Sequence, residues 1–512
     1  MTDSPDAYQE IPYESRSYPQ SHPASLAVIA TLFGMQPRNP DGARVLEIGC
    51  AGGGNLLPIA ASYPGSHFLG IDLSPRQIAE ARAGVEALKL KNIEFKAMSL
   101  ENFEAPPGSF DYIIAHGVYS WVTAPVRERL MALCSRLLAP MGVAYISFNT
   151  LPGSGTRAAL REMVKFHTKH DSTIREQVRH ARSFLTFMES VLRDREDAYA
   201  RSMTEELAQM ASGGDFYIAH EILEETNEPC YFHEFMSHAQ RHGLQFLGEA
   251  EIRTMSNSAF PASVRADLRE MCSSVEEAEQ YADFVRDRAF RQTLLCRAAV
   301  PLKRGISPAL VPQFHFASLL EPVDGAGGAG TGTVSNSHPD PNPGSHPGSG
   351  SNAAGQFRDA DGLVIQVRDP LTSAALLELR AVWPQSLPFA GLLRKACVRA
   401  AVPADSRPAA ATLANSLLKC YSASRGVEFH PHPQVFLTTV PDFPKASPVS
   451  RWQAGRHPLV TSRRHENVLL SPMESALLTE LDGTRGLAAL EAEFGDIRPI
   501  LERFAQSALL IP

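Results

Sequence analysis

Short apolar runs alternate with amphipathic helical stretches over the first 150 residues of the chain. The runs are rich in Val, Ile, Leu and Phe, which is typical of buried parallel strands. The helix after the second run should begin at Ser74, because a serine cap is followed there by a proline at the first helical position. Strands that alternate with helices are typical of a doubly wound sheet, so we expect an α/β fold. The strands should span residues 44–49, 67–71, 92–97, 110–115 and 142–148.

From residue 157 the spacing of the apolar positions changes to three and four, which predicts a helical insert over 157–215. Its apolar stripe is explained equally by packing within the insert and by a homodimer interface. Residues 216–303 contain a helix at 233–242, followed by LQFLGEA at 244–250. We expect the latter segment to complete the sheet as its sixth strand.

The C-terminal region, 304–512, is interrupted at 324–356 by a segment rich in Gly, Ser, Pro and Asn. Val334 is its only branched aliphatic residue, so the segment cannot bury enough apolar surface to fold, and we expect it to be disordered. Strand-like segments lie on either side, at 313–319 and 363–367. We expect them to pair as a hairpin across the long loop.

The end of the chain has a capping box, SPME at 471–474, which predicts the start of a helix. The segment that follows resembles the helix-turn-helix part of small winged-helix-like domains. Its sequence is ALLTELDGTRGLAALEAEF. Residues 486–496 include three acidic residues and no Lys or Arg, whereas a helix in the major groove needs basic contacts. We therefore expect a small α+β winged-helix-like region that binds no nucleic acid.

Composition narrows the class of protein. A net charge of -8 and a pI of about 6.1 argue against electrostatic capture of nucleic acid or of an anionic membrane. Seven cysteines without a C-x-x-C motif favour reduced thiols. The absence of a signal-peptide pattern and of any stretch of 18 apolar residues favours a cytoplasmic enzyme without a membrane partner. The histidines of HEFMSH, at 233–238, are five apart rather than four, so no metal site is indicated.

The most informative segment is VLEIGCAGGGN at 45–55, together with FLGID at 68–72. The first is an apolar strand that ends at a glycine cluster, where the backbone can approach a ligand closely at the start of a helix. Asp72 follows Gly54 by 18 residues, the distance at which an acidic residue in a βαβ unit reaches a ribose diol. The pair predicts a nucleoside-binding site, whereas the alternative is a glycine-rich turn in an ordinary α/β domain.

The residues of the loop separate the possible cofactors. A dinucleotide fingerprint needs glycines where Ala51 and Leu57 stand, and no G-x-x-x-x-G-K-[ST] loop occurs. Glu47 would repel phosphates but tolerate a ligand with an ammonium and a sulfonium. S-adenosylmethionine (SAM) therefore fits best.

Three segments together resemble the class I SAM-dependent methyltransferases. They are the pattern E-x-G-x-x-x-G-x-N, then G-I-D-L-S, and DYIIAHGVYSW at 111–121. Four further segments are similar to the subgroup with a methyltransferase regulatory domain, an architecture shared with some bacterial protein-lysine methyltransferases. They are YQEIPY at 8–13, SHP at 21–23, FNTLPG at 148–153 and YFHEFMSHAQRHGLQFLG at 231–248.

This resemblance implies a Rossmann-like, SAM-binding methyltransferase domain over 1–156 and a regulatory domain over 216–303. The expected cofactor contacts lie in the loops and first helical turns after the first four strands. They are Glu47, Gly49, Cys50, Ala51, Gly52, Asn55, Asp72, Leu73, Gln77, Ser99, Leu100 and His116.

The acceptor pocket should lie beyond the fourth and fifth strands, because open α/β sheets bind ligands at the carboxyl ends of their strands. His116, Tyr119, Trp121 and Asn149 are the candidates for catalytic residues. Trp121 is equally explained as a core aromatic, and His116 as a hydrogen-bonded turn residue. Asn149 stands in FNTLPG, which partly resembles the N-P-P-Y motif of methyltransferases that act on adenine amino groups.

Methyl transfer needs an aligned nucleophile and a site that excludes water, more than it needs strong acids or bases. By resemblance, we expect the acceptor to be a protein lysine. Two alternatives remain open at this stage, namely a methyltransferase acting on a small metabolite and a non-catalytic SAM-binding regulator.

Overall fold

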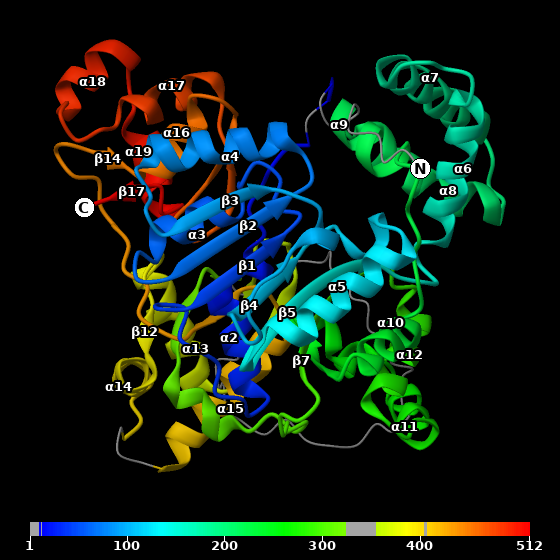
Figure 1. Ribbon diagram of the computed structural model, residues 1–512. Coiled ribbons are helices and arrows are strands. Elements are labelled where there is room, and N and C mark those ends of the chain that lie inside the picture. The colour runs from blue at the N-terminus through cyan, green and yellow to red at the C-terminus, as the bar shows by residue number, and fades with distance from the viewer. Residues whose placement is uncertain (1–9, 12, 324–354, 404–406) are drawn as a thin grey trace. The chain divides into compact units, whose positions relative to one another are not determined.

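A computed structural model describes residues 10, 11, 13–323, 355–403 and 407–512 (Figure 1). The chain divides into two units. Unit 1 comprises Met1–Ile306 and Thr439–Pro512, and unit 2 comprises Ser307–Thr438.

Unit 1 is built on a seven-stranded sheet of order β3-β2-β1-β4-β5-β7-β6. The pairs from β3 to β5 are parallel, and β7 is antiparallel to both of its neighbours. The strand order reverses between β1 and β4, which is where open α/β sheets bind ligands. The strands are β1 (Arg44–Ile48), β2 (His67–Asp72), β3 (Ile93–Ala97), β4 (Phe110–Ala115), β5 (Leu138–Asn149), β6 (Leu244–Glu249) and β7 (Phe290–Arg297).

The five strands expected in the first 150 residues are confirmed. β5 begins at Leu138 rather than near residue 142, because Leu138 pairs with Phe110 across an irregularity in the register. The strand expected at 244–250 is β6. It reaches the sheet only through β7, whose antiparallel pairing was not expected.

Helices cover the sheet, and one of them comes from far along the chain (Figure 1). They include α2 (Pro23–Leu32), α3 (Leu56–Ser62), α4 (Pro75–Leu88), α5 (Ala124–Leu137) and α10 (Phe232–Arg241). Ser74 caps α4 as expected, since its side chain accepts from the N–H of Gln77. Phe232 and Phe235 of α10 belong to the same buried cluster as β1, β4 and β5, so this later segment shares the core of the first 150 residues.

The expected helical insert consists of α6 (Gly155–Thr168), α7 (Ile174–Leu192) and α8 (Ala198–Ser212), which lie together in Figure 1. Their apolar positions face one another around Leu160, Leu185 and Leu207. A short α9 (Asp215–Tyr217) and a π-helical turn (Ile218–Ile222) follow. Phe166 and Phe187 stay more than half exposed, so the internal core accounts for part of the apolar stripe and not for all of it.

The regulatory segment continues through α11 (Ala262–Met271) and α12 (Val275–Arg286) to β7. Arg291 of β7 is fully buried and carries ion pairs with Glu249, Glu279 and Asp283 at 2.6, 3.1 and 2.7 Å. These bonds join β7 to β6 and to α12.

The C-terminal part of unit 1 is a small α+β domain that packs on α3 and α4. The capping box at Ser471 is confirmed. The domain contains β14 (Lys445–Ala446), α16 (Pro448–Ala454), β15 (Leu459–Thr461), β16 (Asn467–Leu469), α17 (Pro472–Glu480), α18 (Leu487–Phe494), α19 (Arg498–Gln506) and β17 (Leu510–Ile511).

Unit 2 corrects one expectation. The segments at 313–319 and 363–367 do not pair, because β8 (His315–Ser318) lies between β12 and β13, while β11 (Val364–Val367) pairs with β10. Most of the segment expected to be disordered lies outside the described residues, and Gly355 and Gln356 begin β10. The other elements are β9 (Glu321–Pro322), β10 (Gly355–Arg358), α13 (Pro370–Val382), β12 (Leu387–Pro388), α14 (Phe389–Ala400), α15 (Arg407–Ala423) and β13 (Val427–His430).

None of the helices in the described part of the chain combines the length and the apolar character needed to cross a bilayer.

Candidate active site

The glycine loop turns sharply between β1 and α3. Gly49 and Gly53 have φ values of +72° and +79°, and a Cβ at these positions would lie 2.7 Å from Val118 and 2.8 Å from Phe95. Such contacts are too short for any side chain, so both positions require glycine. Ala51 also has a positive φ, of 46°.

Asp72 fixes this loop to the end of β2. Its Oδ2 accepts from the N–H of Ala51 and its Oδ1 from the N–H of Ser74, both at 2.9 Å. Burial raises the pKa of Asp72, and these backbone donors oppose the shift. Each carboxylate oxygen can accept a further hydrogen bond, which is what a ribose diol would need.

Glu47 lies behind the loop and is nearly completely buried. Its Oε1 accepts from Asn55 Nδ2 at 2.6 Å. Its Oε2 and the Oε1 of buried Gln77 have no hydrogen-bond partner among the described residues. Burial raises the pKa of Glu47 to about 8, and the nearby charge of Asp72 adds to the shift. Because an unsatisfied buried acceptor costs about 1–3 kcal/mol, these two oxygens point to a ligand that donates hydrogen bonds.

Residues 13–18, which we call the N-terminal strap, lie along the glycine loop. Ser15 Oγ accepts from the N–H of Gly54 at 2.7 Å, and Tyr13 O accepts from Gln77 Nε2 at 3.2 Å. The N–H of Tyr18 donates to Asn55 Oδ1 at 2.9 Å. The sequence did not identify these contacts, and the only signal near them was the YQEIPY segment.

His116 stands next to the strap. Its ring stacks on Tyr18 with the centroids 3.7 Å apart, and its Nδ1 lies 2.8 Å from the hydroxyl of Tyr145. Desolvation among these neighbours lowers the pKa of His116 to about 3, so the ring is neutral at physiological pH. Through Tyr18, the structure brings His116 together with Asn55 and Glu47.

Tyr119, the second residue expected to line the acceptor pocket, does not join this group. The side chain is buried in the main core, where its ring packs against Phe148 and Phe235. Its hydroxyl lies 2.9 Å from Nδ1 of His238. The short helical turn at Tyr119–Trp121 directs this tyrosine inward, and nothing in the local sequence distinguishes the two directions.

Trp121 and Asn149 follow β4 and end β5, and they contact later segments of the chain. The guanidinium of Arg161 is 5.4 Å from the ring of Trp121 and donates to the carbonyl of Ile222. Asn149 Nδ2 donates to Asn227 Oδ1 at 3.0 Å. Both nominated residues are half-buried, Trp121 beside Arg161 of the insert and Asn149 beside Asn227 of the regulatory segment.

The other residues nominated for cofactor binding differ in how far their side chains are exposed to solvent. Cys50 is buried, and its sulfur lies where a side chain on Gly70 would stand. Leu73 is 58% exposed at the end of β2, and Ser99 Oγ accepts from the N–H of Glu101 at the start of the turn that holds Leu100. Gly52 completes the loop itself.

Three side chains that could bind a metal ion lie close together, and the sequence alone did not show that a carboxylate joins the two histidines. Glu128 of α5 faces His238 and His242 of α10, with all their donor atoms within 4.8 Å. Glu128 Oε2 is 3.0 Å from His238 Nε2, and Oε1 is 2.8 Å from His242 Nε2. The contact of His238 is a hydrogen bond, whereas Nε2 of His242 makes no hydrogen bond among the described residues.

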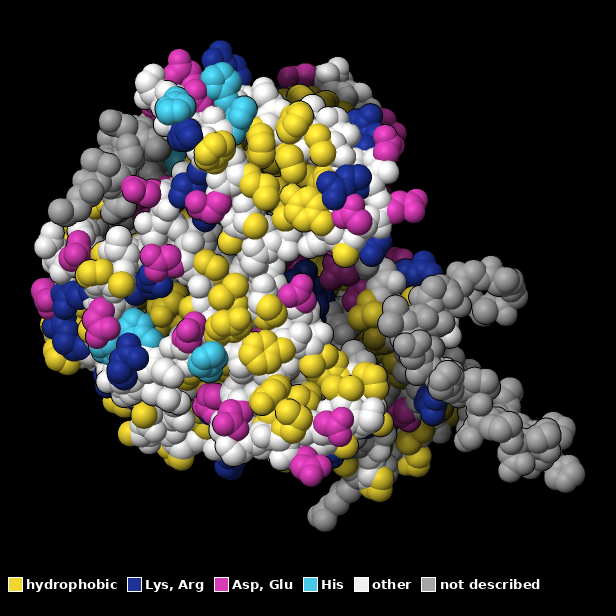
Figure 2. Space-filling model, turned by 90° about the vertical axis from the view of Figure 1, so that its right-hand side faces the viewer, with side chains coloured by type: hydrophobic (Ala, Val, Ile, Leu, Met, Phe, Trp, Pro, Cys, Tyr) yellow, Lys and Arg dark blue, Asp and Glu magenta, His cyan; other side chains and the backbone are white. Residues whose placement is uncertain are grey.

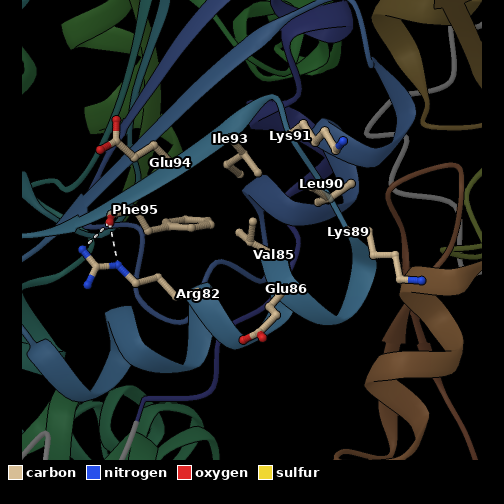
Figure 3. A pocket seen from close by; sticks show the side chains of 9 residues that line it. All are labelled: Arg82, Val85, Glu86, Lys89, Leu90, Lys91, Ile93, Glu94 and Phe95. Carbon is tan, nitrogen blue, oxygen red and sulfur yellow. Dashed lines mark hydrogen bonds between the residues drawn. The ribbon is translucent and has the colours of Figure 1, made fainter.

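A surface pocket of about 390 Å³ lies between α4 and β3. Figure 3 shows the side chains that line it. Arg82 closes one side of it by donating twice to the carbonyl of Phe95. None of the residues nominated for the cofactor or the acceptor lines this pocket, so it is separate from the glycine loop.

Three families match separate parts of the chain. A family described as "Methyltransferase domain" matches residues 45–142, and one described as "Predicted methyltransferase regulatory domain" matches 214–297. A third, described as "PKMT, C-terminal winged helix domain", matches 442–509.

Two Rickettsia prowazekii proteins described as uncharacterized, RP789 and RP028, are 41% and 37% identical to the chain, over 60% and 47% of its length. The alignments cover 56% of the length of RP789 and 96% of that of RP028. The solved structure of PKMT2 from Rickettsia typhi is 26% identical and covers 98% of this chain and 100% of its own, with a TM-score of 0.81. A second structure of PKMT2 is a complex with AdoHcy, the demethylated product of SAM.

The glycine loop at the reversal of the sheet, the buried acidic groups beside it and these matches lead to one assignment. The cofactor of this fold is SAM. The chain belongs to the class I SAM-dependent methyltransferases that carry a methyltransferase regulatory domain.

Proposed function

We propose that the protein transfers a methyl group from SAM to the side-chain amine of a lysine in a protein. The observation that carries the proposal is the similarity to PKMT2 along nearly the whole of both chains, C-terminal winged-helix domain included. The abbreviation denotes a protein-lysine methyltransferase. In the reaction the lysine nitrogen forms a bond to the methyl carbon, the bond from that carbon to sulfur breaks, and the nitrogen loses a proton to solvent.

The unsatisfied acceptors beside the loop support a placement of SAM. We propose that Asp72 accepts from the ribose hydroxyls and that Glu47 Oε2 and Gln77 Oε1 accept from the ammonium of the methionine part. These atoms are buried, so each bond would form with little competition from water. Asp72→Ala should therefore lose most of the affinity for SAM and keep the fold.

The aromatic side chains around His116 support an acceptor with a long apolar stem. Phe290 is 42% exposed, and its ring lies 6.1 Å from the ring of neutral His116. Aromatic faces hold a lysine through cation-π contacts worth about 0.5–2 kcal/mol, and through apolar contact once the amine is neutral. We propose Tyr18, His116, Trp121 and Phe290 as its neighbours.

The test is incubation of the full-length protein with SAM and an array of unfolded peptides, followed by mass spectrometry. Methyl groups on lysine that are absent with Asp72→Ala would support the proposal. Methylation of a metabolite mixture alone would replace the lysine by a small acceptor. Tight binding of SAM without any transfer would favour a non-catalytic regulator.

A further inference from the structure

One hairpin of the C-terminal domain contacts Asn55, at the end of the glycine loop, and the N-terminal strap. Its strands are β15 and β16, and residues 462–466 form the turn. Asn467, at the start of β16, holds the strap from outside. Its Oδ1 accepts from the N–H and the hydroxyl of Ser17 at 3.3 and 2.8 Å, and its Nδ2 donates to the carbonyl of Ser17 at 2.9 Å.

His465, in the turn of this hairpin, contacts Asn55 at the start of α3. It is 5% exposed, and its Nε2 lies 2.7 Å from Asn55 Oδ1, although the two residues are 410 positions apart. The same Oδ1 accepts from the N–H of Tyr18, which can only donate. Asn55 Nδ2 faces the carboxylate of Glu47. These partners fix the orientation of the amide, so the proton of His465 must be on Nε2.

The side chain of Asn55 does not cap its own helix. It stands at the N-cap of α3, yet its side chain makes no capping bond and joins Glu47, Tyr18, Ser21 and His465. The bond to Glu47 occupies Oε1 and leaves Oε2 free to face a ligand. Anything that holds the amide of Asn55 in place therefore also holds this carboxylate.

We propose that the C-terminal domain is part of the cofactor site and that His465 is a positioning residue for SAM. By fixing Asn55, His465 sets the direction of the Glu47 carboxylate, while Asn467 keeps the strap closed over the loop. The inference rests on the proposed placement of SAM at Glu47 and Asp72. It gives the winged-helix-like domain a role in the catalytic half of the molecule.

The packing of the domain on α4 is a separate matter, since it depends on apolar contacts such as that between Trp452 and the helix at Gly84. A merely structural contact would affect stability and leave the site as it is. The informative substitution therefore keeps the conformation of the turn and removes only the hydrogen bond from residue 465 to Asn55. His465 has a φ of +63°, a conformation that asparagine tolerates better than alanine does. His465→Asn meets this requirement because its side chain is too short to reach Asn55.

The experiment is calorimetric titration of the full-length protein with SAM, for the wild type, His465→Asn and Asn467→Ala. Leu469→Ala is the matched control, because Leu469 lies on the same hairpin and is 69% exposed. Loss of one buried hydrogen bond should weaken SAM binding by about 10-fold in His465→Asn, with unchanged binding in Leu469→Ala. The number of protons released on binding should also change, because the surroundings of Glu47 change.

The thermal unfolding of each ligand-free variant is measured in parallel. Wild-type affinity and proton release in His465→Asn would overturn the inference, and so would an affinity loss that only follows a lower unfolding temperature. Asp72→Ala separates the two proposals. If Asp72→Ala binds SAM normally, the placement of the cofactor fails. If it does not bind while His465→Asn does, only the role of His465 fails.

Discussion

At the scale of single residues, the site is defined by buried polar atoms that have no hydrogen-bond partner in the described part of the chain. Glu47 and Gln77 each keep one such atom beside the glycine loop. Burial of the Glu47 carboxyl, with the charge of Asp72 nearby, raises its pKa to about 8. The free protein therefore holds a proton on Glu47 at neutral pH.

A bound ammonium favours the charged carboxylate, so SAM binding below about pH 8 should release a proton. Affinity should accordingly rise with pH toward 8 and fall again at higher pH, where the α-ammonium of SAM itself loses its proton. Titration calorimetry in two buffers of different ionisation enthalpy measures the released protons. Glu47→Gln should bind SAM about 10-fold more weakly at pH 8 and lack this component, because it has lost a charge-assisted bond. Equal proton release in Glu47→Gln and in the wild type would rule out Glu47 as its source.

At the scale of elements, local patterns predicted well what is formed locally. The turn at 49–55, the cap at Ser74 and the box at Ser471 each depend on a few adjacent residues, and all were visible in the sequence. The pairing of β8 with β13 depends on chain that returns from beyond α15, and the strap contacts join residues up to 450 positions apart. No local pattern carries that information. The direction of the Tyr119 ring is likewise not predictable from the sequence, since a short helical turn decides whether the ring faces the site or the core.

The buried ion pairs of Arg291 hold β6, β7 and α12 together. Arg291→Met would leave three buried carboxylates without their main partner, and breaking such a group costs about 3–5 kcal/mol. We expect the free energy of unfolding to fall by that amount. Urea unfolding followed by circular dichroism measures it, with Arg265→Met on exposed α11 as the control. A wild-type midpoint for Arg291→Met would mean that Arg288, which also pairs with Asp283, is sufficient.

At the scale of the whole chain, segments from both ends of unit 1 meet at one amide. Asn55 binds Tyr18 near the start of the chain and His465 near its end. The face drawn in Figure 2 carries the insert and the regulatory helices, and apolar side chains gather there in patches. Large apolar side chains that are exposed in the insert and in the regulatory segment are Phe166, Phe187, Met271 and Phe284.

Gly84 tests whether the docking of the C-terminal domain supports the site. A Cβ there would lie 2.7 Å from Leu57 and 3.1 Å from Trp452, so Gly84→Leu should force α16 away from α4. Overpacking of this kind costs about 1–3 kcal/mol. We expect faster hydrogen exchange in residues 445–511 together with weaker SAM binding. Ala83→Leu, at the exposed neighbouring position, is the control, and unchanged exchange in Gly84→Leu would contradict the prediction.

The hydrogen bond between Asn55 and His465 also has a consequence for synthesis on the ribosome. The glycine loop, β1 and β2 are translated early, whereas the imidazole that holds Asn55 is translated 410 residues later. A nascent chain can build the sheet without completing the site. With His465 in the proposed positioning role, the newly made protein should reach its full affinity for SAM only after residue 465 has been translated.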